Sequence, residues 1–196
     1  MRAVFASRNP HKAEQVAHLL PEVELVPVDD VAPGLELAEP FDTFEANALA
    51  KARAAAAATG LPAIADDSGL EVDALGGRPG VVSAHYAGDG ASDADNNAKL
   101  VAELRALGEE SARCRYRCVA VLVTPDGLEL VAEGSCEGRI VLEGRGTLGF
   151  GYDPHVVPEG ETRTMGEIPL ADKLTFSHRG RAFSALLERM RAEGLV

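Results

Sequence analysis

Residues 63 to 73 read Ala63-Ile64-Ala65-Asp66-Asp67-Ser68-Gly69-Leu70-Glu71-Val72-Asp73, an apolar strand candidate that ends in two adjacent carboxylates, a hydroxyl and a glycine. Two neighbouring acids repel one another unless a cation or a raised pKa relieves them. Oxygen ligands of this kind suit a hard cation such as magnesium, which keeps several waters and is usually shared with substrate phosphates. The same residues also fit an ordinary solvated turn with an Asx cap, so the rest of the chain must decide between the two readings.

The composition provides enough apolar residues for a real core. With 196 residues, 46% of them hydrophobic, the chain suits one domain or two small lobes. The formal net charge of −12 argues against nucleic acid or an anionic membrane as a partner, because both need a basic surface. A small phosphate compound needs only a local group of cations, so this class of ligand is compatible with the charge.

The sequence carries no pattern typical of secretion or membrane insertion. No charge-free apolar run approaches the roughly 20 residues of a membrane helix, and the start MRAVFASRNPHK indicates a strand followed by polar residues rather than a signal peptide. Cys114, Cys118 and Cys136 form no close CxxC pair and fit packing thiols. We therefore expect a cytoplasmic protein.

Strands and helices alternate in the first half of the chain, and strands dominate the second. Asn9-Pro10 gives an N-cap followed by proline at the first helical position, and Asp42 with Glu45 is spaced as a capping-box variant. Pro125-Asp126-Gly127 between two β-branched runs indicates a hairpin. We expect strands over 3–6, 24–28, 63–66, 70–73, 115–124, 128–135 and 138–142, helices over 10–20, 43–59, 92–107 and 177–191, and loops over 31–41, 76–80 and 144–151. This order predicts a single α/β domain over 1–196, a mixed sheet with helices on its faces, in two lobes with a central cleft.

The junction between the first strand and the first helix is a candidate phosphate site. Backbone N–H groups at a helix start attract anions, and Ser7 and Asn9 add polar side chains there. His11 and Lys12 fall in the first helical turn, where a cation opposes the helix dipole unless an anion is bound. An ordinary capped helix with exposed polar residues is the alternative.

Three further groups of residues suggest a nucleotide site, although each has an ordinary structural explanation. Asn47 and Lys51 share one face of the alanine-rich helix, which also suits a solvated face. The run 149–154, Gly-Phe-Gly-Tyr-Asp-Pro, offers aromatic rings on which a base could stack, or which could fill the core. Lys173 and the run Ser177-His178-Arg179 gather donors for carbonyl and phosphate oxygens at a helix start, or form a simple Ser N-cap.

Taken together and in this order, the motifs resemble those of the inosine/xanthosine triphosphate pyrophosphatase family, the HAM1-like enzymes. The matching segments cover almost the whole chain and are ASRNPHKAEQV, TFEANALAKARAAA, AIADDSGLEVDALGGRPGVVSA, GFGYDP and Lys173 with SHRGRAF. The resemblance implies hydrolysis of ITP, dITP, XTP and dXTP to the monophosphate and pyrophosphate. It also implies Mg2+ as cofactor and an elongated, two-lobed homodimer with a Maf/HAM1-like fold.

The resemblance also assigns roles to individual residues. It implies that Asp67 holds magnesium and accepts the proton of the attacking water, and that Ser68 contacts the substrate. The remaining substrate-binding residues that it implies are Ser7, Arg8, Asn9, Pro10, His11 and Lys12 for the triphosphate, and Phe150, Gly151, Tyr152, Asp153, Lys173, His178 and Arg179 around the base and sugar.

Two positions depart from the family pattern, and two other functions remain as rivals. Many relatives carry a glutamate just before Asn47, where this chain has Ala46, and Glu45 is turned by about 100° from that position. The family often has arginine where this chain has His85. A Maf-like pyrophosphatase would act instead on pyrimidine or modified nucleotides, and a regulatory module would bind nucleotide without turnover.

Overall fold

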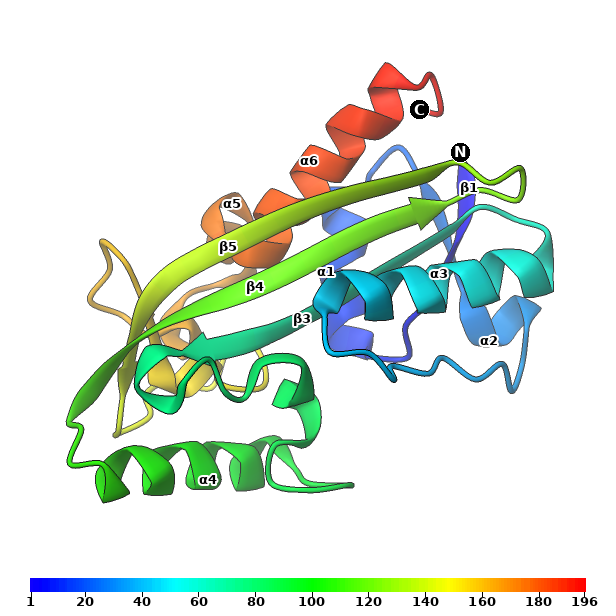
Figure 1. Ribbon diagram of the computed structural model, residues 1–196. Helices are drawn as coiled ribbons and strands as arrows, with labels where there is room; N and C mark the ends of the chain where they lie inside the picture. The colour runs from blue at the N-terminus through cyan, green and yellow to red at the C-terminus, as the bar shows by residue number, and fades with distance from the viewer. The chain divides into compact units, whose positions relative to one another are not determined.

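A computed structural model describes residues 1–196 and contains one six-stranded sheet with the strand order β2-β1-β3-β4-β5-β6 (Figure 1). The strands are β1 (Arg2–Phe5), β2 (Glu24–Pro27), β3 (Ala63–Val72), β4 (Ser111–Val123), β5 (Glu129–Val141) and β6 (Val156–Pro158). β1 pairs in parallel with both β2 and β3, whereas β5 and β6 are antiparallel. The predicted α/β class, a mixed sheet flanked by helices, is confirmed.

Local sequence signals explain where the main helices begin. Asn9 accepts from the amides of His11 and Lys12, and Ser92 forms a reciprocal capping box with Asp95. The helices are α1 (Pro10–Leu19), α2 (Val28–Val31), α3 (Phe44–Thr59), α4 (Asp93–Ala106), α5 (Leu170–Phe176) and α6 (His178–Ala192), with short 3-10 turns η1 (Asp73–Leu75), η2 (Gly80–His85), η3 (Asp153–His155) and η4 (Met165–Glu167). None of the helices combines the length and the apolar composition that a membrane crossing requires.

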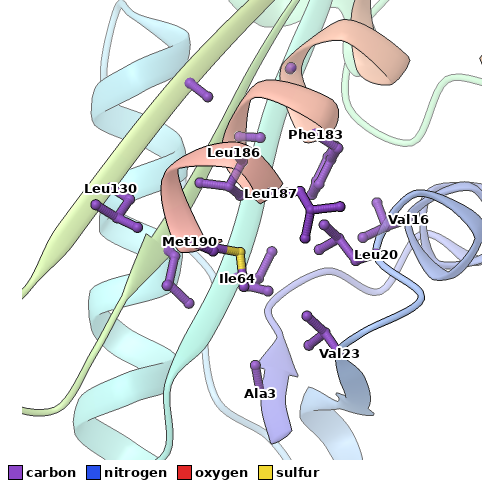
Figure 2. Packing of buried hydrophobic residues seen from close by; sticks show 14 of the residues in the cluster. Ala3, Val16, Leu20, Val23, Ile64, Leu130, Phe183, Leu186, Leu187 and Met190 are labelled. Carbon is purple, nitrogen blue, oxygen red and sulfur yellow. The ribbon is translucent and has the colours of Figure 1, made fainter. Parts of the chain in front are cut away.

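The chain forms two compact units, and β3, β4 and β5 contribute residues to both. Unit 1 comprises Met1–Asp67, Cys118–Gly134 and Arg179–Val196, and unit 2 comprises Ser68–Arg117 and Ser135–His178. In unit 1, α6 buries Phe183, Leu186 and Met190 among side chains of α1 and the strands (Figure 2). The core of unit 2 is built by Leu70, Leu100, Leu104, Tyr116, Ile140 and Tyr152 with their neighbours. Two lobes were predicted; the cleft between them stays a prediction.

Several predicted boundaries were wrong for identifiable reasons. β3 continues without a break to Val72, so Asp66 and Asp67 lie inside a strand rather than at its end, because burial on both sides outweighs the turn propensity of Asp-Ser-Gly. The predicted capping box of Asp42 and Glu45 is absent, since Thr43 caps α3 by accepting from the amide of Ala46 at 3.2 Å. The predicted strand over 138–142 is the end of β5, and α2, α5 and β6 were missed because each is short.

Candidate active site

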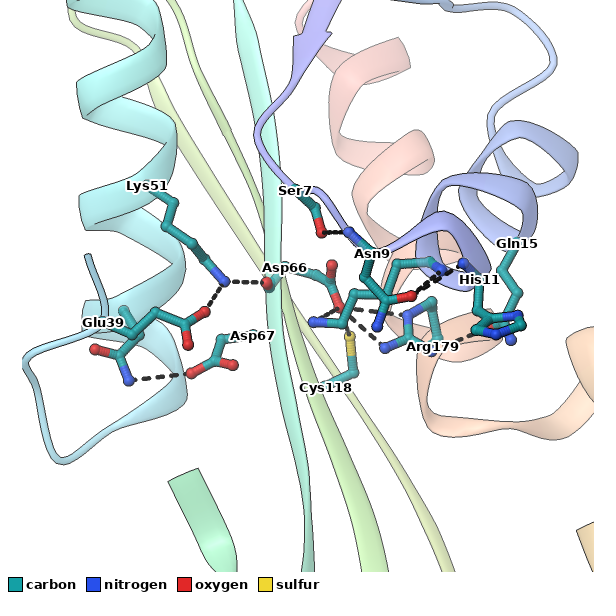
Figure 3. A network of polar contacts seen from close by, with 12 residues as sticks. Ser7, Asn9, His11, Gln15, Glu39, Lys51, Asp66, Asp67, Cys118 and Arg179 are labelled. Atoms are coloured by element: carbon teal, nitrogen blue, oxygen red, sulfur yellow. Dashed lines mark hydrogen bonds and ion pairs between the residues drawn. The ribbon is translucent and has the colours of Figure 1, made fainter. Parts of the chain in front are cut away.

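Asp66 and Asp67 present their carboxylates on opposite sides of β3, because successive side chains of a strand alternate (Figure 3). In unit 1, α1 and α6 supply the neighbours of Asp66, and α3 supplies those of Asp67. Both acids are buried, with Asp66 fully inaccessible and Asp67 4% exposed. The two adjacent aspartates therefore lie in two separate electrostatic environments.

Asp66 is the partner of two cations. Its Oδ2 lies 3.1 Å from Lys12 Nζ and accepts from Nε and Nη2 of Arg179 at 3.3 and 3.1 Å. Burial raises the pKa of Asp66, but Lys12, Arg179 and Lys51 outweigh it and hold that pKa well below its usual range. Two cations face one carboxylate, so this cluster keeps a surplus positive charge.

The strand register explains why Lys12 reaches Asp66. β1 and β3 run parallel with Phe5 beside Ile64, so the segment that follows β1 emerges beside the residues that follow Ile64. Asn9 then caps α1 and directs its first turn across Asp66 (Figure 3). The structure therefore brings this junction and the Asp66-Asp67 pair together within unit 1.

The other residues of the predicted triphosphate segment are held by their own local contacts. Ser7 Oγ accepts from the amide of Asn9 at 3.3 Å, while Asn9 Oδ1 accepts from the amides of His11 and Lys12 at 2.9 and 3.2 Å. Pro10 occupies the first helical position. These bonds fix the helix start and leave Lys12 as the cation whose side chain lies over Asp66.

Arg8 points to a different partner. Its guanidinium donates to the Asp29 carboxylate at 2.8 to 3.1 Å and to the Leu35 carbonyl at 2.8 Å. This fork ties α2 and the following loop to the end of β1, and the Arg8 side chain is 45% exposed. Its geometry describes a structural clamp, and the predicted triphosphate contact of Arg8 stays a prediction.

Asp67 lies in a mixed environment of amide, cation and carboxylate. Asn47 Nδ2 donates to Asp67 Oδ2 at 3.1 Å, while Lys51 Nζ contacts the Asp66 carbonyl at 2.8 Å and pairs with Glu39. Burial raises the pKa of Asp67; Lys51 opposes this effect and Glu39 adds to it. The buried carboxylate is thus poised to accept a proton more readily than an exposed aspartate.

Asn47 also fixes the loop that brings Glu39 to this place. Its side-chain amide accepts from the Phe41 N–H at 2.9 Å and donates to the Phe41 carbonyl at 3.1 Å. Lys51, 4% exposed, then holds Glu39 by an ion pair. The predicted pair Asn47 and Lys51 is therefore a buried framework for the acids rather than a solvated face.

Asp67 and Glu39 form a donor set that fits magnesium. Both supply carboxylate oxygens in unit 1, and the raised pKa of Asp67 indicates that the protein alone compensates its charge incompletely. No group of three or more His, Cys, Asp or Glu side chains that could hold a metal is present in residues 1–196. Two carboxylates suffice for a Mg2+ ion, which usually completes its shell with water and phosphate oxygens.

A second polar group lies in unit 2 around Asp153. Asp153 Oδ2 accepts from Lys173 Nζ at 2.9 Å, and its Oδ1 accepts from the Tyr116 hydroxyl at 3.1 Å. The Tyr116 ring stacks on His178 with centroids 4.6 Å apart. The structure therefore brings together the predicted residues Asp153, Lys173 and His178, which come from three separate segments.

The neighbouring loop residues have different roles. The Gly151 amide donates to Asp93 at 2.6 Å and its carbonyl accepts from Asn97 at 2.9 Å, so α4 clamps this peptide. Tyr152 is buried in the core of unit 2, and its hydroxyl donates to the Ser83 carbonyl at 2.8 Å. Of the two aromatics, Phe150 is half-buried, whereas Tyr152 matches the core-filling alternative. Ser68 is half-buried in β3.

Sequence reasoning missed Glu39 and Tyr116 and did not foresee the contacts that Arg179 makes. Glu39 lies in a proline- and glycine-containing loop where one acid among several carries no spacing signal. Tyr116 was counted only as part of an apolar strand. The side chain of Arg179 contacts Asp66 and, through Nη1, Gln15 at 2.9 Å in unit 1. Its predicted contact with the base and sugar stays a prediction.

Comparison with known proteins identifies the class. The Ham1 family profile matches residues 3–189. A solved structure of a Ham1 protein from Coxiella burnetii superposes with a TM-score of 0.89 at 37% identity, over 98% of this chain and 99% of the other. A solved structure of the Ham1 protein from Staphylococcus aureus superposes with a TM-score of 0.88 at 35% identity, over 98% of this chain and 100% of the other. The chain therefore belongs to the Ham1 family, and the resemblance seen in the motifs is confirmed.

Two curated relatives carry a specific activity in their names. A dITP/XTP pyrophosphatase from Nocardia farcinica is 46% identical over 97% of this chain and 95% of its own length. A dITP/XTP pyrophosphatase from Geobacter sulfurreducens is 44% identical over 99% of this chain and 98% of its own length. The similarity thus extends over essentially complete chains.

Proposed function

We propose that this protein hydrolyses the non-canonical purine nucleotides ITP, dITP, XTP and dXTP to the monophosphate and pyrophosphate, and so cleanses the nucleotide pool. The observation that carries the proposal is the buried carboxylate of Asp67, which lies near two lysines and a second carboxylate and has a raised pKa. The chain that carries it belongs to the Ham1 family. The names of the relatives supply the purine preference. The Maf-like alternative is not favoured, because the family match is to Ham1.

Asp67 is the proposed proton acceptor. Water attacks the α-phosphorus, a new P–O bond forms, the bond from that phosphorus to the bridging oxygen breaks, and pyrophosphate leaves while the water proton passes to the Asp67 carboxylate. Burial makes Asp67 a stronger base than a solvated aspartate, and Asn47 fixes the carboxylate by its 3.1 Å hydrogen bond. A base of this kind needs positioning more than covalent chemistry.

Lys12 is the proposed phosphate-binding cation. Asp66 holds its ammonium at 3.1 Å, and the lysine side chain keeps 13% of its surface exposed. Because Arg179 shares the same carboxylate, the charge of Lys12 is only partly cancelled and a surplus remains for phosphate oxygens. Ser7 to His11 shape the helix start from which Lys12 projects, and the direct phosphate contacts proposed for these residues rest on the resemblance.

Magnesium is the proposed cofactor, with Asp67 and Glu39 as the side chains that would hold it. The ion would neutralise charge on the triphosphate and on the leaving pyrophosphate when bound. Lys51 keeps Glu39 in place through their ion pair, and Asn47 does the same for Asp67. This proposed set includes neither Ala46 nor Glu45, the residues at which the chain departs from the family pattern.

The nucleoside contacts are assigned to residues of unit 2. Phe150, Asp153, Lys173 and His178 are proposed to recognise the base and sugar, and Gly151 lets the backbone approach closely. A site that donates hydrogen bonds to the 6-keto oxygen discriminates against amino purines, because a ligand that leaves buried polar groups unpaired loses binding energy. The role of Ser68, the homodimer and the cytoplasmic location stay proposals; light scattering and cell fractionation test the last two.

The test measures pyrophosphate separately from phosphate with ITP, dITP, XTP, ATP, GTP and UTP in the presence of Mg2+. We expect pyrophosphate from the first three, loss of at least about 100-fold in kcat in Asp67→Asn, and unchanged turnover in the control Asp30→Asn, an exposed acid of α2. Faster turnover of UTP than of ITP would select the Maf-like reaction. Tight ITP binding without pyrophosphate release would select the regulatory module and refute the enzyme.

A further inference from the structure

Tyr116, which is flanked by Arg115 and Arg117 in β4, is the centre of the polar group in unit 2. It projects from β4, is 6% exposed, and makes two different contacts with residues that the proposed function uses. Its hydroxyl donates to Asp153 at 3.1 Å, and its ring lies against His178 at 4.6 Å with an interplanar angle of 16°.

The hydroxyl of Tyr116 completes the coordination of a buried carboxylate. Asp153 Oδ2 is occupied by Lys173 at 2.9 Å and by the Phe150 amide at 3.4 Å, so Tyr116 supplies the donor on the opposite oxygen. The three donors together fix the carboxylate plane and, through it, the Lys173 ammonium. Burial and the Asp153 carboxylate raise the pKa of Tyr116 well above its usual value, which keeps the hydroxyl a donor.

The loop at Gly149 packs so closely against Asp153 and Lys173 that it leaves no space for an added side chain. Gly149 has φ +88°, and a Cβ placed there would overlap the Asp153 carboxylate and come within 2.5 Å of Lys173 Nζ. Lys173 itself is 6% exposed. The positions of Asp153 and Lys173 are therefore set by Gly149 on one side and by the Tyr116 hydroxyl on the other.

The ring of Tyr116 fixes the plane of the imidazole. His178 is the first residue of α6 and half-buried, and a nearly parallel aromatic neighbour restricts rotation about its ring torsion. An imidazole that donates to a base carbonyl must be held in plane with it, since hydrogen bonds weaken steeply with misalignment. Stacking therefore has a direct consequence for base recognition.

We propose that Tyr116 is a positioning residue for purine recognition, with its hydroxyl holding the Asp153–Lys173 pair and its ring holding the plane of His178. The inference rests on the proposed function and deepens it, because it separates two contributions to nucleotide binding that two substitutions can remove one at a time. Tyr116→Phe deletes the hydroxyl and keeps the stacking. Tyr116→Leu deletes both.

Tyr86 provides a matched control. Tyr86 also lies in unit 2 and is also 6% exposed. Its hydroxyl donates to a carboxylate as well, that of Glu103 at 2.7 Å, but neither Tyr86 nor Glu103 belongs to the proposed site. Tyr86→Phe therefore imposes the same chemical change at the same burial. Any effect that it shares with Tyr116→Phe reports general loss of stability.

The experiment compares steady-state hydrolysis of ITP and ATP by the wild type and the three variants with Mg2+. We expect Tyr116→Phe to raise the KM for ITP about tenfold with little change in kcat, the change that loss of one hydrogen bond to a charged group produces. It should keep the preference for ITP over ATP, whereas Tyr116→Leu should reduce that preference about fivefold. Tyr86→Phe should leave both quantities unchanged.

A second readout is independent of turnover. The imidazole proton signals of His178, assigned with His178→Gln, should keep their ring-current shift in Tyr116→Phe and lose it in Tyr116→Leu. Normal turnover by the wild type with a KM in Tyr116→Phe no higher than in Tyr86→Phe would overturn this inference alone. A wild type that releases no pyrophosphate from ITP or XTP would overturn the proposed function and this inference with it.

Discussion

Replacement of Asp66 by asparagine removes the charge that two buried cations share. Lys12 Nζ lies 3.1 Å from Asp66 Oδ2, and Arg179 contacts the same oxygen with two nitrogens at 3.1 and 3.3 Å. The variant keeps the side-chain volume and leaves both cations without their carboxylate. The adjacent Asp67→Asn makes the same chemical change on the other face of β3, where burial has raised the carboxyl pKa.

The structure sets the expected size of the effect. Removing one partner of a buried ion pair costs about 3 to 5 kcal/mol, and we expect the lower end, near 3 kcal/mol, because the Lys12 side chain keeps 13% exposure to solvent. At this chain length that corresponds to a fall of about 6 to 12 °C in Tm. Asp67→Asn removes a charge that burial disfavours, so its expected effect is neutral or stabilising.

The pH dependence of stability gives the sign of each effect independently. The pKa of Asp66 in the folded state lies below its usual value of 3.8. The stability that the ionised Asp66 contributes is therefore complete above pH 3.8 and is lost as the pH falls toward the folded-state pKa. The pKa of Asp67 in the folded state is raised. The stability that the protonated Asp67 contributes is therefore present below its usual pKa and is lost as the pH rises through the folded-state pKa. The two variants should therefore diverge most at neutral pH.

Urea unfolding followed by circular dichroism measures both variants beside the wild type. We expect the stability gap of Asp66→Asn to be constant from neutrality to about pH 5 and to shrink below about pH 4, while Asp67→Asn loses activity without losing stability. Equal losses of stability in the two variants would refute the electrostatic reasoning, since they would show that either substitution merely disturbs the strand.

Three further predictions concern the same regions. Arg8→Ala should raise the KM for ITP less than about twofold, because the guanidinium of Arg8 is already bound to Asp29. Lys12→Ala should raise that KM more than about tenfold. Comparable effects of the two variants in steady-state kinetics would show that Arg8 also binds phosphate. Gly149→Ala should lower kcat/KM about tenfold, because the added methyl would overlap the Asp153 carboxylate and displace it. The positive φ would also cost about 1 to 2 kcal/mol of stability, and unchanged kinetics would show that the loop accommodates the methyl. Removal of divalent ions with EDTA should abolish turnover, and restoration by Mg2+ but not by Na+ is the outcome that supports a magnesium site.

Local rules predicted the parts of the fold that depend on neighbouring residues. Asn9-Pro10 and Ser92 mark the starts of α1 and α4 because their side chains reach amides only two or three residues away. The hairpin around residues 125–127 follows from turn chemistry in the same way, with Gly127 donating to the Thr124 carbonyl at 3.0 Å. The failures came where tertiary burial overrode local preference, as in the uninterrupted passage of β3 through Asp66, Asp67 and Ser68.

The sequence by itself determined the class of the protein and the chemistry available to it. The order of five motifs placed the chain in its family, and the two adjacent aspartates indicated a candidate site. Strand geometry alone sends their side chains to opposite faces, wherever the strand lies. Only the tertiary structure decided which aspartate meets Lys12 and Arg179 and which meets Asn47. That choice depends on the packing of α1, α3 and α6, whose contributing residues lie as far as 113 positions from Asp66 and which no local rule relates to it.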